Sequence, residues 1–126
     1  MSTKRVLVVD DEPAFRELVK RTLRQAGYLV DEAPDGEVAL ALFREHRPDL
    51  IILDIVMPTK DGLETLRGIR ARDQEVPILA VSAGGLISSQ DYLKPAALLG
   101  ASQTLAKPFP MSELLSAVAT LLKRQS

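Results

Sequence analysis

Polar side chains stand where four short apolar runs of this sequence end. They are Asp10, Asp11 and Glu12 after RVLVV, Asp54 after LIIL, Ser82 at the end of PILAVS, and Lys107 after SQTLA. Crowded carboxylates repel one another unless a cation or a proton intervenes, so acids gathered at one place imply a compensating charge. Carboxylates suit a hard ion such as Mg²⁺, whereas the absence of cysteine and the single histidine argue against zinc. Mg²⁺ beside a lysine and a serine is the equipment of phosphoryl transfer, in which Asp54 would be the nucleophile that forms an acyl phosphate.

These residues can cooperate only if the apolar runs are neighbouring strands. Five runs have strand character, and the apolar positions between and after them recur at helical spacing. The strands are expected at 5–9, 28–33, 50–53, 77–82 and 102–106, and helical patterns cover 15–23, 38–43, 63–69 and 112–126. This alternation predicts an α/β fold, a doubly wound parallel sheet with helices on both faces. In such a sheet, ligands bind beyond the carboxyl ends of the strands, which is where the polar residues stand.

Composition limits the alternatives. With 126 residues, 46% of them hydrophobic, we expect one domain over residues 1–126. The net charge is −1 with acids and bases spread through the sequence, so no basic field indicates nucleic acid, and we expect no direct contact with it. The apolar run at 6–9 is too short for a signal peptide, and no stretch approaches the roughly 20 apolar residues of a membrane helix. We therefore expect a cytoplasmic protein without membrane contact.

Four segments closely resemble the motifs of two-component response regulator receiver domains. They are VLVVDDEP, LIILDIVMPTKDG, ILAVSA and LAKPF, and they occur in the family's order and spacing over nearly the whole chain. The resemblance implies a flavodoxin-like (βα)5 three-layer sandwich with strand order 2-1-3-4-5. It also implies a phosphoacceptor module, similar to stand-alone chemotaxis regulators, rather than a conventional turnover enzyme.

The resemblance assigns a role to each residue that matches a motif. Asp54 resembles the phosphoacceptor. Lys107 would pair with the phosphoryl oxygens, and its peptide bond to Pro108 would be cis. Ser82 would move its hydroxyl onto the phosphoryl group after transfer. The implied Mg²⁺ ligands are Asp54, Asp11, the Val56 carbonyl and, through water, Asp10.

The sequence departs from the family in two places. Thr104 stands where the family usually has an aromatic residue that moves with the switch hydroxyl, so the usual pairing of the two motions is not expected here. The stretch from Ser82 to Lys107 is a few residues longer than usual. It contains Gly84 and Gly85, and Pro95 removes a helix donor, so the fourth helix is expected to be kinked or to start late.

The partners implied by the resemblance are a sensor histidine kinase, a histidine phosphotransferase, or both. No output domain follows the last helix in this sequence, so we expect output by contact. A downstream protein would bind the face formed by the fourth helix, the fifth strand and the fifth helix. A monomer or weak dimer is expected, either as a stand-alone regulator or as the receiver of a larger one.

Other interpretations compete with this one. A haloacid-dehalogenase-type phosphatase also uses a strand-end aspartate with Mg²⁺, but it generally needs a second aspartate where this chain has Val56. A flavin module is less consistent, because the acids would repel its phosphate. Individually, Asp11 before Pro13 could be a helix N-cap, and Ser82 could satisfy a backbone group. By placement alone, Val56 and Gly84 should flank the water that hydrolyses an acyl phosphate.

Overall fold

The computed structural model describes residues 3–55, 62–83, 96–97 and 100–124, and over these the predicted alternation of strands and helices is present. In chain order the elements are β1 (Arg5–Val9), α1 (Pro13–Gln25), β2 (Leu29–Ala33), α2 (Gly36–Glu45), β3 (Leu50–Asp54), α3 (Gly62–Arg72), β4 (Ile78–Ala83), β5 (Gln103–Lys107) and α5 (Met111–Lys123). Ala96 and Ala97 are also helical. Gly84, Gly85 and Pro95, on which the prediction about the fourth helix depends, lie outside the described residues.

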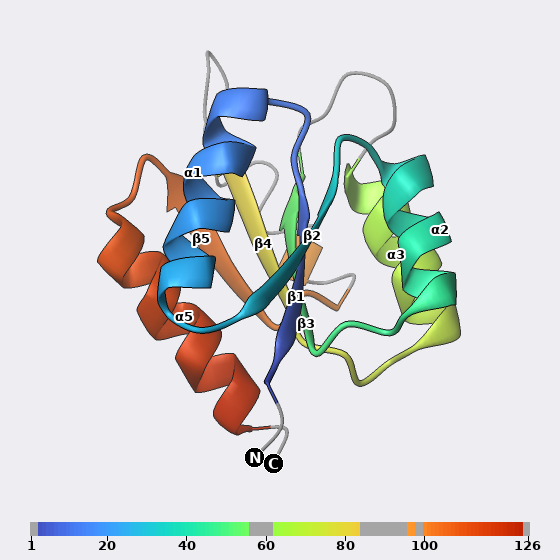
Figure 1. Cartoon of the computed structure of the whole chain (residues 1–126). Helices are drawn as coiled ribbons and strands as arrows, with labels where there is room; N and C mark the ends of the chain where they lie inside the picture. The colour runs from blue at the N-terminus through green and yellow to red at the C-terminus, as the bar shows by residue number, and fades with distance from the viewer. Residues whose placement is uncertain (1–2, 56–61, 84–95, 98–99, 125–126) are drawn as a thin grey trace.

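The strands form one parallel sheet in the order β2-β1-β3-β4-β5 (Figure 1). Its centre is β3, whose five residues are all buried. Such a strand must be apolar along its length because helices cover both faces of the sheet. The α/β class and the flavodoxin-like strand order are confirmed.

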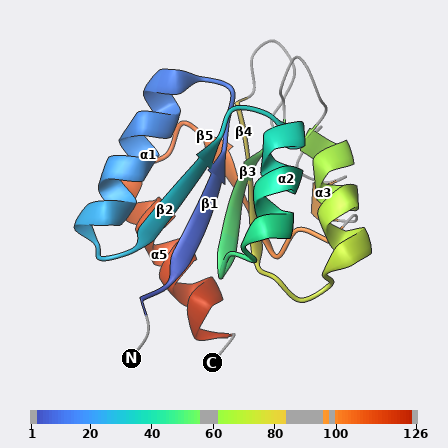
Figure 2. The same cartoon turned by 45° about the vertical axis from the view of Figure 1, so that its right-hand side comes forward.

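Helices lie on both sides of the sheet and divide the core into two clusters (Figure 2). One cluster packs the sheet against α2 and α3 and includes Phe43, Leu66 and Ile69. The other packs it against α1 and α5 and includes Leu23 and Leu114. Because side chains alternate along a strand, β1, β2, β3 and β4 each contribute to both clusters. Membership of a cluster therefore tells which face of the sheet a residue belongs to.

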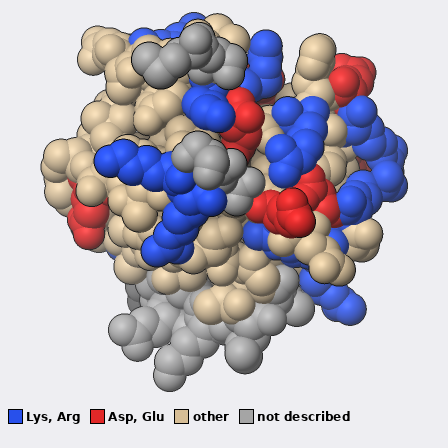
Figure 3. Space-filling model, turned by 90° about the horizontal axis from the view of Figure 1, so that it is seen from below, with Lys and Arg blue, Asp and Glu red and all other residues tan. Residues whose placement is uncertain are grey.

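The two ends of the molecule differ in charge. The helices α1, α2, α3 and α5 each have a basic residue in the last turn, where a cation interacts favourably with the helix dipole. These residues are Arg24, Arg44, Arg70, Arg72 and Lys123. Figure 3 views the end at which these helices finish, and lysine and arginine side chains are spread over it with acidic side chains among them. The carboxyl ends of the strands lie at the opposite end, in a different electrostatic environment.

Within the described part of the chain, no helix combines the length and apolar character needed to cross a membrane.

The connection from α3 to β4 depends on Asp73. One carboxylate oxygen of Asp73 accepts hydrogen bonds from the backbone N–H groups of Glu75 and Val76, both at 2.9 Å. The other oxygen accepts from the guanidinium of Arg47, which follows α2. The Arg47 hydrogen bond, aided by those backbone donors, lowers the pKa of Asp73 from 3.8 to about 2. Asp73 thus links the ends of two neighbouring helices.

We predict that Arg47→Ala raises the pKa of Asp73 and destabilises the fold by about 1 kcal/mol at neutral pH, since this half-exposed ion pair is screened by water. The folded-state pKa is depressed, so the stabilisation is complete above about 3.8 and is lost as pH falls through about 2. Carboxyl NMR titration measures the pKa, and denaturant unfolding at several pH values measures the stability. Arg44→Ala, an exposed change on the same helix end, should leave the Asp73 titration unaltered. An unchanged Asp73 pKa in Arg47→Ala would contradict the assignment.

Candidate functional site

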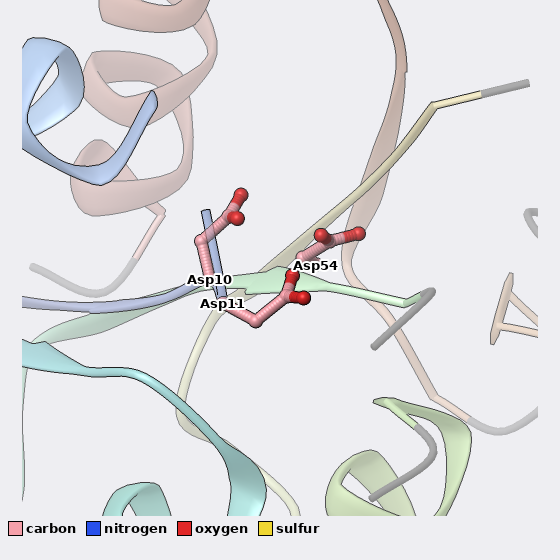
Figure 4. A group of neighbouring side chains, drawn as sticks. All are labelled: Asp10, Asp11 and Asp54. Carbon is pink, nitrogen blue, oxygen red and sulfur yellow. The ribbon is translucent and has the colours of Figure 1, made fainter. Parts of the chain in front are cut away.

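The polar residues singled out in the sequence meet because the strand ends are in register. Val9 pairs with Leu53, Asp54 with Val81, and Ala83 with Lys107. Asp10 and Asp11 follow the last residue of β1, so they lie beside the end of β3 (Figure 4). The register of the sheet, rather than sequence proximity, brings residues 10, 54 and 107 together.

Asp10, Asp11 and Asp54 form a close carboxylate cluster (Figure 4). Each offers one oxygen such that the three ligand atoms lie within 4.8 Å of one another. Asp10 is 1% exposed and Asp54 5% exposed, whereas Asp11 is exposed. Since like charges repel one another, a nearby cation would stabilise this arrangement.

Lys107 supplies part of the compensating charge. Its Nζ lies 3.0 Å from Asp10 Oδ2 and 3.7 Å from Asp54 Oδ2, and its side chain is only 13% exposed. If Lys107 is protonated and the three aspartates are ionised, the four side chains together still carry a net negative charge. The peptide bond between Lys107 and Pro108 is cis, the isomer that the motif implied.

Asp10 is held from several directions. Its Oδ1 accepts a hydrogen bond from the backbone N–H of Glu12 at 2.9 Å, and its Oδ2 accepts from Lys107. Its carbonyl oxygen accepts from Arg16 Nη1 at 2.7 Å, and Arg16 also pairs with Glu32 on β2. Both carboxylate oxygens of Asp10 are thus already engaged, which supports a role through water rather than direct metal ligation.

Asp11 is not needed to cap α1. The N-cap residue is Glu12, its side chain makes no capping hydrogen bond, and Pro13 opens the helix. Proline suits this position because the first N–H groups of a helix have no partner within it. The interpretation of Asp11 as an N-cap is therefore wrong, and its exposed carboxylate remains directed to the cluster.

Ser82 and Thr104 lie on the face of the sheet that packs against α2 and α3, opposite to the face of Asp54 and Lys107. Ser82 is fully buried and continues the alternation of Ile78 and Ala80, which belong to the α2 and α3 cluster. Thr104 pairs with Ala80 in register, and it is half-buried. By the same alternation, Asp54 and Lys107 follow Ile52 and Leu105 of the α1 and α5 cluster. Val56 and Gly84 lie outside the described residues.

The donor set fits Mg²⁺. All three groups offer hard carboxylate oxygens, and Mg²⁺ binds such ligands at 2.0–2.1 Å while it keeps several waters, so opposite ligands stand about 4 Å apart. A separation of at most 4.8 Å needs only small side-chain adjustments for two direct ligands and one water-mediated contact. The family motifs imply Asp11 and Asp54 as the direct ligands, with Asp10 acting through water.

Two residues near this cluster were not recognised in the sequence as part of the site. Arg16 donates a hydrogen bond to the carbonyl oxygen of Asp10, and the ring of Phe15 lies against the Lys107 ammonium. Both stand in the first turn of the helix that follows Asp10 and Asp11. That position is the one signal that could have indicated them.

Gly62, the first residue of α3, packs directly on the strand that carries Asp54. Its N–H donates to the carbonyl oxygen of Ile55 at 3.0 Å. A Cβ at this position would lie 2.4 Å from the carbonyl oxygen of Asp54 and 2.4 Å from Ile55 Cα. Only glycine permits this approach of helix and strand backbone.

Comparison with known proteins points to one family. The sequence model of the response regulator receiver domain matches residues 6–119. Response regulator MprA of Mycobacterium sp. (strain KMS) is 43% identical over 122 residues, which cover 97% of this chain and 52% of that protein. MprA of Mycobacterium avium (strain 104) is 42% identical over 120 residues, 95% of this chain and 51% of that one. The chain spans about half the length of these curated relatives.

Solved structures with the same fold include two receivers. Chemotaxis protein CheY4 of Vibrio cholerae is 34% identical with a TM-score of 0.86, and the match covers 95% of this chain and 99% of that one. The receiver domain of NtrX from Brucella abortus is 32% identical with a TM-score of 0.87, over 94% of this chain and 98% of that one.

We predict that Gly62→Ala destabilises the protein by about 1–3 kcal/mol, because the added methyl overlaps backbone atoms that cannot move aside. Gly68→Ala, in the same helix, is the matched control. Its Cβ would meet Leu40 Cδ1 and Cδ2 at 3.4 Å, and it should stabilise the helix by about 0.5–1 kcal/mol. Chemical denaturation of the two variants tests the contrast, and equal effects would show that the close approach is unimportant.

Proposed function

The chain belongs to the response regulator receiver domain family, and from this we propose that a phosphoryl group transferred to Asp54 switches its binding to a partner protein. The donor is a phosphohistidine of a sensor histidine kinase or of a histidine phosphotransferase. The observation that carries the proposal is the position of Asp54: a 5% exposed carboxylate at a strand end, with Asp10 and Asp11 within 4.8 Å and Lys107 Nζ at 3.7 Å.

The transfer forms one bond and breaks another. A carboxylate oxygen of Asp54 attacks phosphorus, and the P–N bond to the donor imidazole breaks with its electron pair going to nitrogen, which then takes up a proton. Mg²⁺, when held by Asp11, Asp54 and the Val56 carbonyl, supplies positive charge against the phosphoryl oxygens. Lys107 would pair with another phosphoryl oxygen. Asp10 holds Lys107 and, through water, the metal.

Ser82 and Thr104 are the proposed switch residues. After transfer, the Ser82 hydroxyl donates to a phosphoryl oxygen, which draws the end of β4 toward the site. Thr104 lies on the same face as Ser82, near enough in register for the β5 surface to respond. Thr104 carries no ring, so the signal must pass through backbone and packing rather than through an aromatic rotamer.

Output is proposed to occur at the face of the fourth helix, β5 and α5. The domain exchanges between two conformations, and a protein partner binds one of them at this face. The acyl phosphate shifts the balance between the two conformations. We place this signalling in the cytoplasm, with a single receiver domain over residues 1–126 acting as a monomer or weak dimer and making no direct contact with nucleic acid or membrane. Slow hydrolysis of the acyl phosphate resets the switch, without turnover of an external substrate.

We predict that acetyl phosphate with Mg²⁺ adds one phosphoryl group to the chain, seen by intact mass, and that EDTA or Asp54→Asn abolishes the addition. Asp31→Asn is the matched control. Asp31 lies on β2 and pairs with Arg5 of β1, away from the cluster, so this variant should be modified like the wild type. Sustained release of phosphate from a phosphomonoester that depended on Asp54 would instead favour the phosphatase interpretation.

A second prediction concerns the lifetime of the acyl phosphate. Val56 and Gly84 stand two residues after Asp54 and Ser82, and we expect them to flank the path of the hydrolytic water. Larger polar side chains at both positions should change the dephosphorylation rate several-fold while phosphorylation by acetyl phosphate still occurs. A rate identical to wild type in the double variant would rule out this control of water access.

A further inference from the structure

An aromatic ring lies against the ammonium of Lys107. The Nζ atom is 3.9 Å from the centroid of the Phe15 ring, well inside the range of a cation–π interaction. Phe15 comes from the first turn of α1, whereas Lys107 ends β5, so the contact joins two elements far apart in the sequence. The family motifs quoted above do not predict a contact between Phe15 and Lys107.

The ring completes the surroundings of the ammonium. Asp10 Oδ2 lies 3.0 Å and Asp54 Oδ2 3.7 Å from Nζ, and the Phe15 ring meets the same atom. The Lys107 side chain is only 13% exposed. Cation–π attraction is strongest where water is excluded, so the interaction should be stronger at this largely buried lysine than at an exposed one.

The ring is itself held in place. Phe109, two residues after Lys107, meets it edge to face, with centroids 6.1 Å apart and an interplanar angle of 88°. This is a favoured geometry for aromatic pairs, since the positive edge of one ring meets the negative face of the other. Both rings also pack on the α1 and α5 core cluster. Phe15 therefore has a defined orientation toward Lys107.

We propose that Phe15 is a positioning residue for Lys107. A lysine side chain has several rotatable bonds and loses considerable entropy when fixed. The Phe15 ring restricts the ammonium to the space between Asp10 and Asp54, where a phosphoryl oxygen would meet it. The consequence for phosphorylation rests on the proposed function, whereas the ring contact does not.

The test compares variants that keep or remove the ring. Phe15→Leu and Phe15→Met keep an apolar side chain without a π face, and Phe15→Tyr keeps the face. Phe43→Leu, the same chemical change in the α2 and α3 cluster, is the matched control. Thermal unfolding first establishes that each variant is folded. Three probes follow: the Lys107 ε-methylene NMR signal in metal-free protein, the affinity for Mg²⁺ alone, and the affinity for beryllofluoride with Mg²⁺.

We expect the Lys107 ε-methylene protons to be shifted upfield by the ring in wild type and Phe15→Tyr. In Phe15→Leu and Phe15→Met they should move toward the position of an exposed lysine. Beryllofluoride, which mimics the phosphoryl group, should bind about three- to tenfold more weakly to the ring-free variants. Affinity for Mg²⁺ alone should stay within about twofold of wild type, because the proposed metal ligands do not include Lys107.

The proposal is overturned if the wild-type lysine signal lacks the ring shift. It is also overturned if Phe15→Tyr or Phe43→Leu loses as much beryllofluoride affinity as Phe15→Leu, or if affinity for Mg²⁺ alone falls by the same factor. Failure of the proposed function looks different: wild type would then bind no beryllofluoride, while the NMR comparison would still report on the ring and the ammonium.

Discussion

The rest of this structure depends on the repulsion among three carboxylates that the sheet holds together. The parallel register of β1 with β3 puts Asp10 and Asp11 beside Asp54, and the strands behind them are buried on both faces. The strands that hold these acids side by side cannot separate without breaking that core. Lys107 offsets only part of their charge, so a further cation would stabilise the group. A fold that keeps like charges close together gives up stability in order to be sensitive to any added charge.

The sheet also separates the two halves of the proposed switch. Strand alternation puts Asp54, Asp10 and Lys107 with the α1 and α5 cluster, and Ser82 and Thr104 with the α2 and α3 cluster. A change of charge on one face must therefore act through the end of a strand to reach the other. Ser82 is at such an end, on the strand next to Asp54. Its hydroxyl is thus suited to report the state of Asp54 to the opposite face.

The sequence predicted what depends on periodicity, and it could not predict what depends on packing. Apolar runs marked five strands, and their parallel arrangement was enough to bring Asp10, Asp54 and Lys107 to one edge. Strand order needed the family resemblance, because apolar pattern alone does not say which strands are neighbours. The contacts of Phe15 and Arg16 depend on the rotation of α1 over the sheet, which helical spacing does not specify. Asp11 was a plausible cap by residue type, but the helix starts after Glu12 instead.

Lys107 is the point at which these constraints meet. In the present arrangement its ammonium is nearer to Asp10 than to Asp54, at 3.0 Å against 3.7 Å. A phosphoryl group on Asp54 would bring further negative charge and strong acceptor oxygens, so the balance between the two acids would shift toward residue 54. Because the Phe15 ring contacts the ammonium independently of both acids, it can limit how far that shift moves the side chain. The remaining movement would fall on β5 itself, the strand that ends at Lys107 and carries Thr104.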